Sequence, residues 1–226
     1  MAVNVDVVRV FTDLEGRHGN PLGIVDAALV PVDERQAVAK ELGYSETVFV
    51  ELPDAGIDRA RLQIYTPVTE LPFAGHPTVG TAWWLEQRGT PVSTLEASAG
   101  DIATRKSGDV WWVRARADWA PEFSLYPLDT VEDVQASDPK QFGEGHHYVW
   151  AWEDKLEHAV RTRMFAPDMG IAEDEATGAA AVRLTENLRL SLLITQGRGS
   201  QLRTTYDPDG WIEVGGLVRA EESLTL

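Results

Sequence analysis

The chain has no cysteine, few basic residues and no long apolar run. Without cysteine, its 226 residues can form no disulfide, thiolate nucleophile, zinc–cysteine site or iron–sulfur cluster. Lys and Arg number 20 against 36 Asp and Glu, which gives a net charge of −16. An acidic surface of this strength disfavours nucleic acid and anionic membranes as partners, but it says nothing about a locally positive cleft.

No stretch of the chain approaches the length of an apolar membrane span. The sequence starts directly with a β-branched segment at residues 3–8 and lacks the basic and apolar regions of a signal peptide. We therefore expect a cytoplasmic protein. A hydrophobic content of 43% is sufficient for a packed core, and the length allows one large domain or two small ones.

Strand and helix patterns alternate along the chain. Helices are predicted at residues 33–42, with Asp33 as the cap and Gly43 as the end, and at 76–88 and 177–189. The second helix is apolar on all sides, which indicates burial. Residues 117–144 are rich in Pro, Asp and Glu and favour a long loop or domain junction. Strands are predicted at residues 4–12, 22–25, 47–51, 60–64, 92–97, 110–116, 147–152, 162–166, 192–195, 202–206 and 211–214.

A similar motif occurs in both halves of the chain. Tyr-Thr-Pro at 65–67 precedes Glu-Leu-Pro-Phe-Ala-Gly-His-Pro-Thr at 70–78, and Phe-Ala-Pro at 165–167 precedes Glu-Asp-Glu-Ala-Thr-Gly-Ala at 173–179. Each copy indicates a strand, a short loop and a helix that begins with small residues. His76 lies four residues before Gly80, and Asp174 lies four residues before Gly178, so we expect matching positions in two similar halves. If the halves face each other, two helix N-termini and two titratable groups meet in one cleft, which suits anion binding and proton transfer.

Two side chains of the first half are candidates for that chemistry. Glu46, which precedes an apolar strand, is either a solvent-facing glutamate or a base whose pKa is raised through partial burial by Tyr44 and Val48. His76 is either an ordinary first-turn histidine or a functional group. The small residues before His76 favour the functional role, because they allow a ligand to approach the free N–H groups of the helix.

Asp174 is the candidate of the second half. It is either the N-cap of the following helix or a catalytic carboxylate, and both roles can hold at once. The flanking Glu173 and Glu175 are interpreted as solvated charges. No metal site is predicted, because adjacent strand residues such as His146 and His147 point to opposite faces and no third ligand is near them.

These segments together resemble the phenazine-biosynthesis isomerase (PhzF-like) family. The similarity is carried by residues 11–12, 19–22, 45–47, 66–67, 70–78, 163–167, 173–174 and 176–178, it extends to 214–216, and the run at 70–78 is highly specific. The resemblance implies a diaminopimelate-epimerase-like α+β fold, in which two similar lobes each curl a sheet around a central helix and the active site lies between them. We assign the lobes to residues 1–108 and 109–226, with a last strand that can return to the first lobe.

The resemblance also implies an enzyme, a homodimer and no cofactor. In the family's best-known reaction, a carboxylate takes a proton from a ring carbon of a dihydro-hydroxyanthranilate and returns it elsewhere. The family glutamate, histidine and aspartate correspond to Glu46, His76 and Asp174, so we expect a cofactor-independent isomerase that acts on a small carboxylated substrate. Substrate contacts are expected from five further residues: Asn20, Gly75, Thr177, Gly178 and Ala179.

Two departures from the family pattern leave alternatives open. Ala179 stands where the family commonly has serine, and the second lobe looks short between residues 118 and 161. A catalytically lapsed homologue that binds a metabolite or a protein is therefore one alternative, and a one-base epimerase of an amino-acid derivative is another. A racemase that uses two thiols is excluded because the chain has no cysteine.

Overall fold

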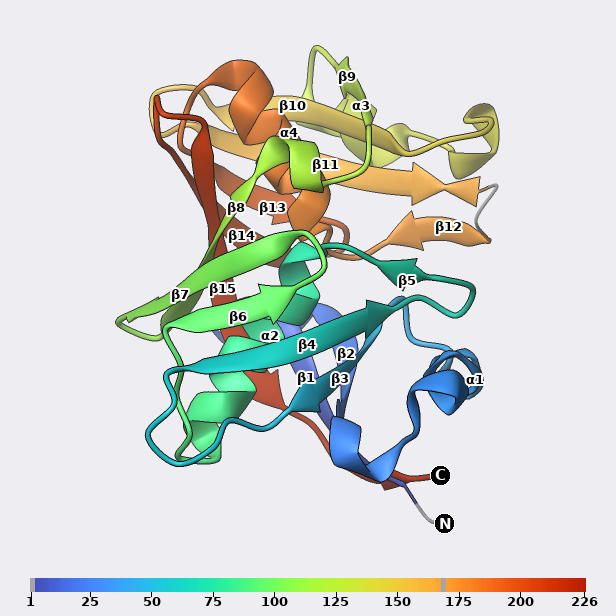
Figure 1. Ribbon diagram of the computed structural model, residues 1–226. Coiled ribbons are helices and arrows are strands. Elements are labelled where there is room, and N and C mark those ends of the chain that lie inside the picture. Colours follow the sequence, from blue (N-terminus) through green and yellow to red (C-terminus); the bar gives the residue numbers. More distant parts are fainter. Residues whose placement is uncertain (1–2, 168–169) are drawn as a thin grey trace.

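Two central helices organise the fold, one in each lobe. In the computed structural model, which describes residues 3–167 and 170–226, α2 (Gly75–Gln87) lies inside the N-terminal lobe and α4 (Gly178–Leu188) inside the C-terminal lobe (Figure 1). Ten of the thirteen residues of α2 are buried, as its apolar pattern predicts. The first and last described residues, Val3 and Leu226, exchange two backbone hydrogen bonds at the base of the N-terminal lobe.

A continuous sheet surrounds both helices. Along the described residues its order is β16-β1-β2-β3-β4-β6-β7-β8-β15-β14-β13-β11-β10-β9, with β5 on β4 and β12 on β11. Because β1 also pairs with β15, the strands around α2 close into a ring. The strands are β1 (Asn4–Thr12), β2 (Asn20–Asp26), β3 (Thr47–Glu51), β4 (Arg59–Tyr65), β5 (Glu70–Leu71), β6 (Thr94–Ala97), β7 (Gly100–Ser107), β8 (Val110–Arg116), β9 (Ser124–Pro127), β10 (His147–Asp154), β11 (Ala159–Ala166), β12 (Ile171–Asp174), β13 (Leu193–Gln196), β14 (Ser200–Tyr206), β15 (Trp211–Ala220) and β16 (Leu224–Thr225).

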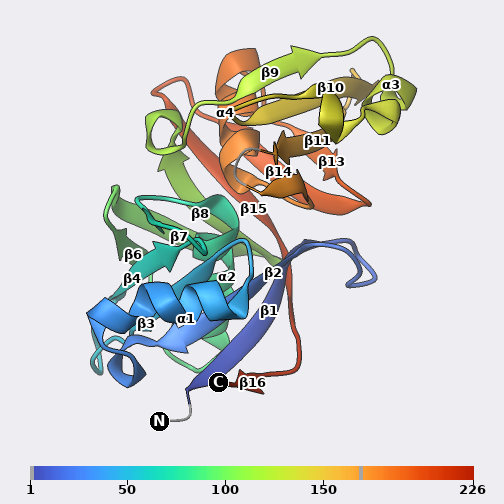
Figure 2. The ribbon, with the colours of Figure 1, turned by 90° about the vertical axis from the view of Figure 1, so that its right-hand side faces the viewer.

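Strand β15 joins the two lobes. Its first part pairs with β8 and β14, and its last part pairs with β1, from Leu217 to Ala220. The loop between β1 and β2 extends at the level where the lobes meet (Figure 2), and there the Gly19 backbone N–H donates a hydrogen bond to Ser200 Oγ on β14. The boundary predicted after residue 108 falls in the turn between β7 and β8, and the division of the chain at that point remains a prediction.

Most of the expected elements are present, and the helix cap at Asp33 is wrong. Asp33 lies inside a 3-10 turn, Val32–Glu34, that Pro31 starts, and α1 (Arg35–Leu42) follows it without a side-chain cap. Gly43 ends α1 in the left-handed conformation, with φ of 68°, as predicted. The strands expected at 4–12, 47–51 and 110–116 have the predicted bounds.

The long loop expected at residues 117–144 is also wrong. This segment contains β9, which pairs in parallel with β10, and α3 (Val131–Ala136). The Thr130 hydroxyl accepts a hydrogen bond from the Asp133 backbone N–H, and the Asp133 carboxylate accepts one from the Thr130 backbone N–H. The acidic residue that suggested a loop is thus part of a capping box that starts a short helix.

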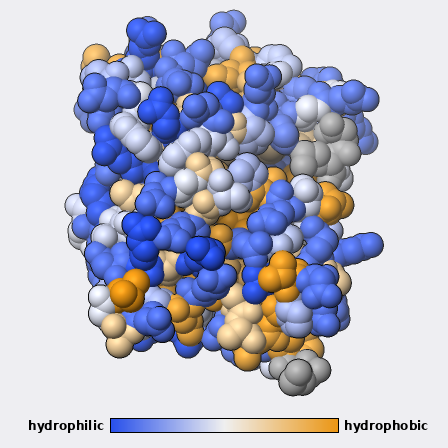
Figure 3. All heavy atoms as spheres, in the orientation of Figure 1, coloured by the Kyte–Doolittle hydropathy of each residue, from blue (hydrophilic) through white to orange (hydrophobic). Residues whose placement is uncertain are grey.

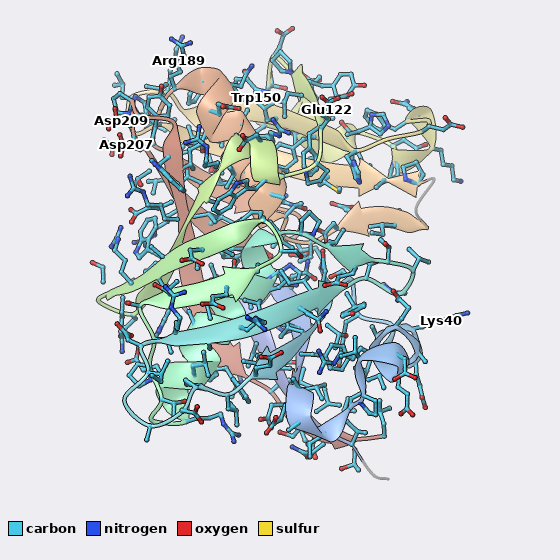
Figure 4. All side chains as sticks on the ribbon, viewed as in Figure 1. Lys40, Glu122, Trp150, Arg189, Asp207 and Asp209 are labelled. Carbon is cyan, nitrogen blue, oxygen red and sulfur yellow. The ribbon has the colours of Figure 1, made fainter. Side chains whose placement is uncertain are left out.

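The face of the molecule drawn in Figure 3 is largely hydrophilic. In the view of Figure 3, apolar residues appear at mid-height, where the two lobes meet, and near the base. Charged side chains such as Lys40 and Asp209 project from the periphery (Figure 4). Within the described part of the chain, no helix is both long and apolar enough to cross a membrane.

Gly215 of β15 offers a test of how tightly the lobes are joined. A Cβ atom at this position would lie 2.6 Å from the Trp111 carbonyl oxygen and 2.6 Å from the Trp112 ring. We expect Gly215→Ala to lower the free energy of unfolding by about 1–3 kcal/mol through overpacking, with a decrease in the melting temperature of roughly 2–4 °C per kcal/mol. Gly143→Ala is the control for thermal denaturation, because Gly143 has open space around it. Equal melting temperatures for Gly215→Ala and Gly143→Ala would contradict tight packing around Gly215.

Candidate active site

The two central helices begin in direct backbone contact. A Cβ atom on Gly75 would lie 2.7 Å from Gly178 Cα, and a Cβ atom on Gly178 would lie 2.8 Å from Gly75 Cα. Only glycine fits at either position without a shift of the backbone. The two helix N-termini therefore converge, as the repeated motif suggests, and the N–H groups of both first turns are oriented toward the junction of the lobes.

The expected match between His76 and Asp174 is not observed. Gly75 and Gly178 are the first residues of their helices, so they are the equivalent pair. His76 is the second residue of α2, whereas Asp174 ends β12 before α4 begins. The alignment of Gly80 with Gly178 is wrong, because Gly80 lies inside α2 whereas Gly178 is the first residue of α4.

Glu46 and His76 nevertheless face each other inside the N-terminal lobe. Glu46 Oε2 lies 3.6 Å from His76 Nε2, and the two side chains are 18% and 3% exposed. Within the described residues, neither of these two buried atoms has a hydrogen-bond partner. The His76 ring has a hydrogen bond with the backbone of Pro21. Since Pro21 has no N–H, the ring must donate to the carbonyl through Nδ1, which leaves Nε2 with a free lone pair toward Glu46.

Burial shifts the titration of both groups toward their neutral forms. It raises the pKa of Glu46 to about 7, against the opposing hydrogen bond from Ser45. It lowers the pKa of His76 to about 4, although the Asp174 charge and the Pro21 carbonyl act in the opposite direction. Near neutral pH the pair is therefore an uncharged imidazole beside a carboxyl group close to half-ionisation. The solvent-facing alternative for Glu46 is wrong, because its side chain is mostly buried.

Asp174 is held by side chains and does not cap α4. Its Oδ1 accepts a hydrogen bond from Asn20 Nδ2 at 2.7 Å, and its Oδ2 accepts one from the Thr177 hydroxyl. The N-cap of α4 is Thr177. Burial, followed by the Glu46 charge, raises the pKa of Asp174 to about 6, while Thr177, His76 and Asn20 lower it. The capping interpretation of Asp174 is therefore wrong.

A cavity of about 470 Å³ lies beside these groups, at the junction of the lobes. It reaches Ser45, which precedes Glu46, and it reaches Asp174 directly. Its walls combine polar groups with apolar side chains, including Tyr44, Val68 and Ile171. The lining residues are Asn20, Pro21, Gly43, Tyr44, Ser45, Thr66, Pro67, Val68, Gly170, Ile171, Ala172, Glu173, Asp174 and Glu175.

The residues predicted to bind substrate lie around the two helix starts, and of the five only Asn20 lines the cavity. Asn20 is buried and also donates a hydrogen bond to the Ala176 carbonyl at 3.1 Å. Ala179 is buried as the second residue of α4, and its backbone N would lie 3.3 Å from a Cβ atom on Gly75. The structure thus brings together all eight predicted site residues around the two helix starts.

The interpretation as a solvated charge is wrong for Glu175, whose side chain is 14% exposed, whereas Glu173 is exposed as expected but is also ion-paired. Glu173 accepts two hydrogen bonds from the Arg163 guanidinium, at 2.8 and 2.7 Å. Glu175 accepts hydrogen bonds from the Arg198 backbone and side chain and from the Ser200 hydroxyl. The partners lie on β11, β14 and the turn between β13 and β14, so no local pattern around residues 173–175 could reveal them.

Gln196 is a further residue of the site that no sequence pattern indicated. It lies 19 residues beyond Thr177, outside both motif copies, and its fully buried side chain reaches the loop between β12 and α4. For metal ions, no group of three or more His, Asp or Glu side chains in the described residues is arranged to hold one.

Comparison with known proteins places the chain in a family. A family model described as phenazine biosynthesis-like protein matches residues 8–116. The chain is 30% identical over 207 residues to the trans-2,3-dihydro-3-hydroxyanthranilate isomerase of Pseudomonas fluorescens, an alignment that covers 75% of this chain and 74% of the relative. The chain belongs to the phenazine biosynthesis-like (PhzF) family of isomerases.

Solved structures agree with the fold expected for the PhzF family. The crystal structure of a PhzF-family protein from Bacillus anthracis superposes with a TM-score of 0.78 at 20% identity and covers 100% of this chain and 99% of that one. A hydroxyproline epimerase from Agrobacterium vitis superposes with a TM-score of 0.64 at 14% identity and covers 100% and 92%. The predicted two-lobed, epimerase-like α+β fold is therefore confirmed.

Asp174→Asn tests the electrostatic state of the site through pH. In the wild type, the raised pKa of Asp174 contributes stability that is fully present below pH 3.8 and is lost as pH rises through about 6. Asparagine does not ionise, so the melting temperature of Asp174→Asn relative to wild type should increase between pH 4 and pH 8. Thermal denaturation across this range measures the difference in melting temperature between the variant and the wild type. Asp58→Asn is the control, because the pKa of Asp58 is lowered. A difference that stays constant or decreases would show that Asp174 ionises freely in the folded protein.

Proposed function

We propose that this PhzF-family protein is a cofactor-independent isomerase that moves a proton between two carbon atoms of a small carboxylated substrate. The observation that carries the proposal is the buried pair of Glu46 and His76, whose facing atoms lie 3.6 Å apart without other partners in the described residues. Buried polar atoms without partners are costly, and such strain is concentrated at functional sites.

The proton chemistry follows from the free lone pair on His76. When Glu46 is ionised, Glu46 Oε2 and His76 Nε2 are both hydrogen-bond acceptors. A proton taken up by Glu46 can therefore be shared in a hydrogen bond between these two atoms. In the forward step, ionised Glu46 removes a proton from a substrate carbon, and the electron pair of the broken C–H bond forms an enol or enolate. Protonated Glu46 then returns the proton to a second carbon, where a new C–H bond forms. A group with a pKa of about 7 suits both steps near neutral pH.

The substrate carboxylate belongs at the two helix starts. The described residues that line the cavity include no Lys or Arg, and neither Gly75 nor Gly178 lines it. An anion at the helix starts would be held by backbone N–H groups. We assign the carboxylate to the N–H groups near Gly75 and Gly178, where the partial positive charges of two helix dipoles add. Asp174, oriented by Asn20, is then placed to bind a hydroxyl or amino group of the substrate.

The relative's substrate provides the direct test. We expect this protein to isomerise trans-2,3-dihydro-3-hydroxyanthranilate or a close carboxylated analogue, and mass spectrometry in D₂O should detect a product that retains part of the transferred hydrogen. Binding without turnover across a panel of such carboxylates would instead identify a lapsed homologue. If the protein shows no binding and no turnover with any of these carboxylates, the assignment of the cavity as the substrate site is contradicted.

Glu46→Gln separates the base from the fold. Glutamine keeps the shape of the side chain and removes its basicity, so kcat should fall by about 100-fold or more. In the wild type kcat/KM should rise with pH through about 7, as Glu46 ionises. The matched control is Glu51→Gln, a neutralised glutamate on the exposed end of β3. Steady-state kinetics measure kcat for both variants. Equal kcat values for Glu46→Gln and Glu51→Gln would exclude Glu46 as the base.

A further inference from the structure

Gln196 makes as many hydrogen bonds as its side chain allows. Its Nε2 donates to the Asp174 carbonyl and to Thr177 Oγ1, both at 2.9 Å. Its Oε1 accepts from the Thr177 backbone N–H and from the Tyr148 hydroxyl, both at 3.1 Å. The amide thus uses two donors and two acceptor positions in a place where its exposed fraction is 0%.

The orientation of this amide is determined by its backbone partners. The Thr177 N–H can only donate and the Asp174 carbonyl can only accept, so a rotation of the amide by 180° would break both bonds. The Tyr148 hydroxyl, which is also fully buried, adapts to this orientation because it can rotate. Gln196 therefore presents a fixed N–H group to Thr177.

The fixed N–H determines where the Thr177 proton goes. Since Thr177 Oγ1 accepts from Gln196, its own proton is directed to Asp174 Oδ2. The donors from Tyr148 through Gln196 and Thr177 all point toward Asp174, and hydrogen bonds aligned in one direction strengthen each other. Asn20 supplies the donor to the other carboxylate oxygen.

We propose that Gln196 is a positioning residue of the active site, which fixes the rotation of the Thr177 hydroxyl so that Asp174 meets the substrate with both oxygens held as acceptors. The proposal rests on the proposed function for its catalytic meaning, while the hydrogen-bond chain itself can be tested without turnover. A glutamine that merely anchored the start of α4 would stabilise the fold and leave the properties of Asp174 unchanged.

The titration of Asp174 distinguishes these two roles. The charged and titratable groups that act on Asp174 are Glu46 and His76 from the N-terminal lobe and Tyr148 from β10. Against burial and the Glu46 charge, the donors from Thr177 and Asn20 favour the ionised carboxylate. Loss of a well-directed donor must therefore raise the pKa of Asp174.

A double-mutant cycle, read by carboxyl ¹³C NMR titration of the full chain, tests the proposal. The Asp174 signal is assigned by its absence in Asp174→Asn. Thr177→Val should raise the pKa of Asp174 by about one pH unit or more, as expected for a hydrogen bond to a charged group. Gln196→Met should raise it in the same direction, and the double variant should raise it no further than Thr177→Val alone, because both act on one link.

Gln63→Met is the matched control, because Gln63 is a hydrogen-bonded glutamine on β4 that does not line the cavity. If Gln196→Met does not fold, Gln196→Asn shortens the reach of the amide and serves in the same cycle. An unchanged pKa of Asp174 in the Gln196 variant, or additive effects of the two substitutions, would overturn the proposal. Because the titration needs no substrate, a wild type without isomerase activity would refute the proposed function and leave this test intact.

Discussion

The contact between Gly75 and Gly178 is the constraint on which the site depends. Two helix starts can touch only where neither carries a side chain, and the built Cβ distances of 2.7 and 2.8 Å leave no room for one. This contact brings two positive helix ends to one point and sets Ala74, the N-cap of α2, opposite Thr177, the N-cap of α4. The curled sheets, the shared strand β15 and the polar bonds between Asn20 and the C-terminal lobe hold the two helices in that position.

The same arrangement places three titratable groups where water is scarce. Burial drives Glu46, His76 and Asp174 toward their neutral forms, and the charges of Glu46 and Asp174 disfavour each other. Above about pH 7 the folded protein must keep two buried carboxylates ionised, which lowers its stability relative to a chain with amides there. A protein selected for stability alone would not retain this cluster, so the cost itself points to chemistry at the site.

Local patterns in the sequence predicted much of this fold and site. The all-apolar sequence of α2 indicated a buried helix, and Gly43 marked the end of α1. The small residues before His76 suggested the approach of a ligand, whereas in the structure Gly75 contacts Gly178 at the start of α4. The missed features depend on partners far along the chain. Glu173 and Glu175 look like surface charges until Arg163 and Arg198 are folded against them, and Gln196 has no distinguishing neighbours. The capping box of Thr130 and Asp133 was a local signal, but the surrounding proline and acidic residues obscured it.

The alanine at position 179 can be interpreted from the bonds of its neighbours. The serine common in the family would add a hydroxyl at this position, beside Gly75. Without this hydroxyl, both carboxylate oxygens of Asp174 still accept a hydrogen bond, one from Thr177 and one from Asn20. Glu46 and His76 likewise face each other without any group from α4 between them. A hydroxyl at position 179 would therefore act on the substrate and not on the charge arrangement. Its absence bears on which carboxylate the proposed site would select, while Glu46 and His76, the groups proposed to move the proton, remain in place.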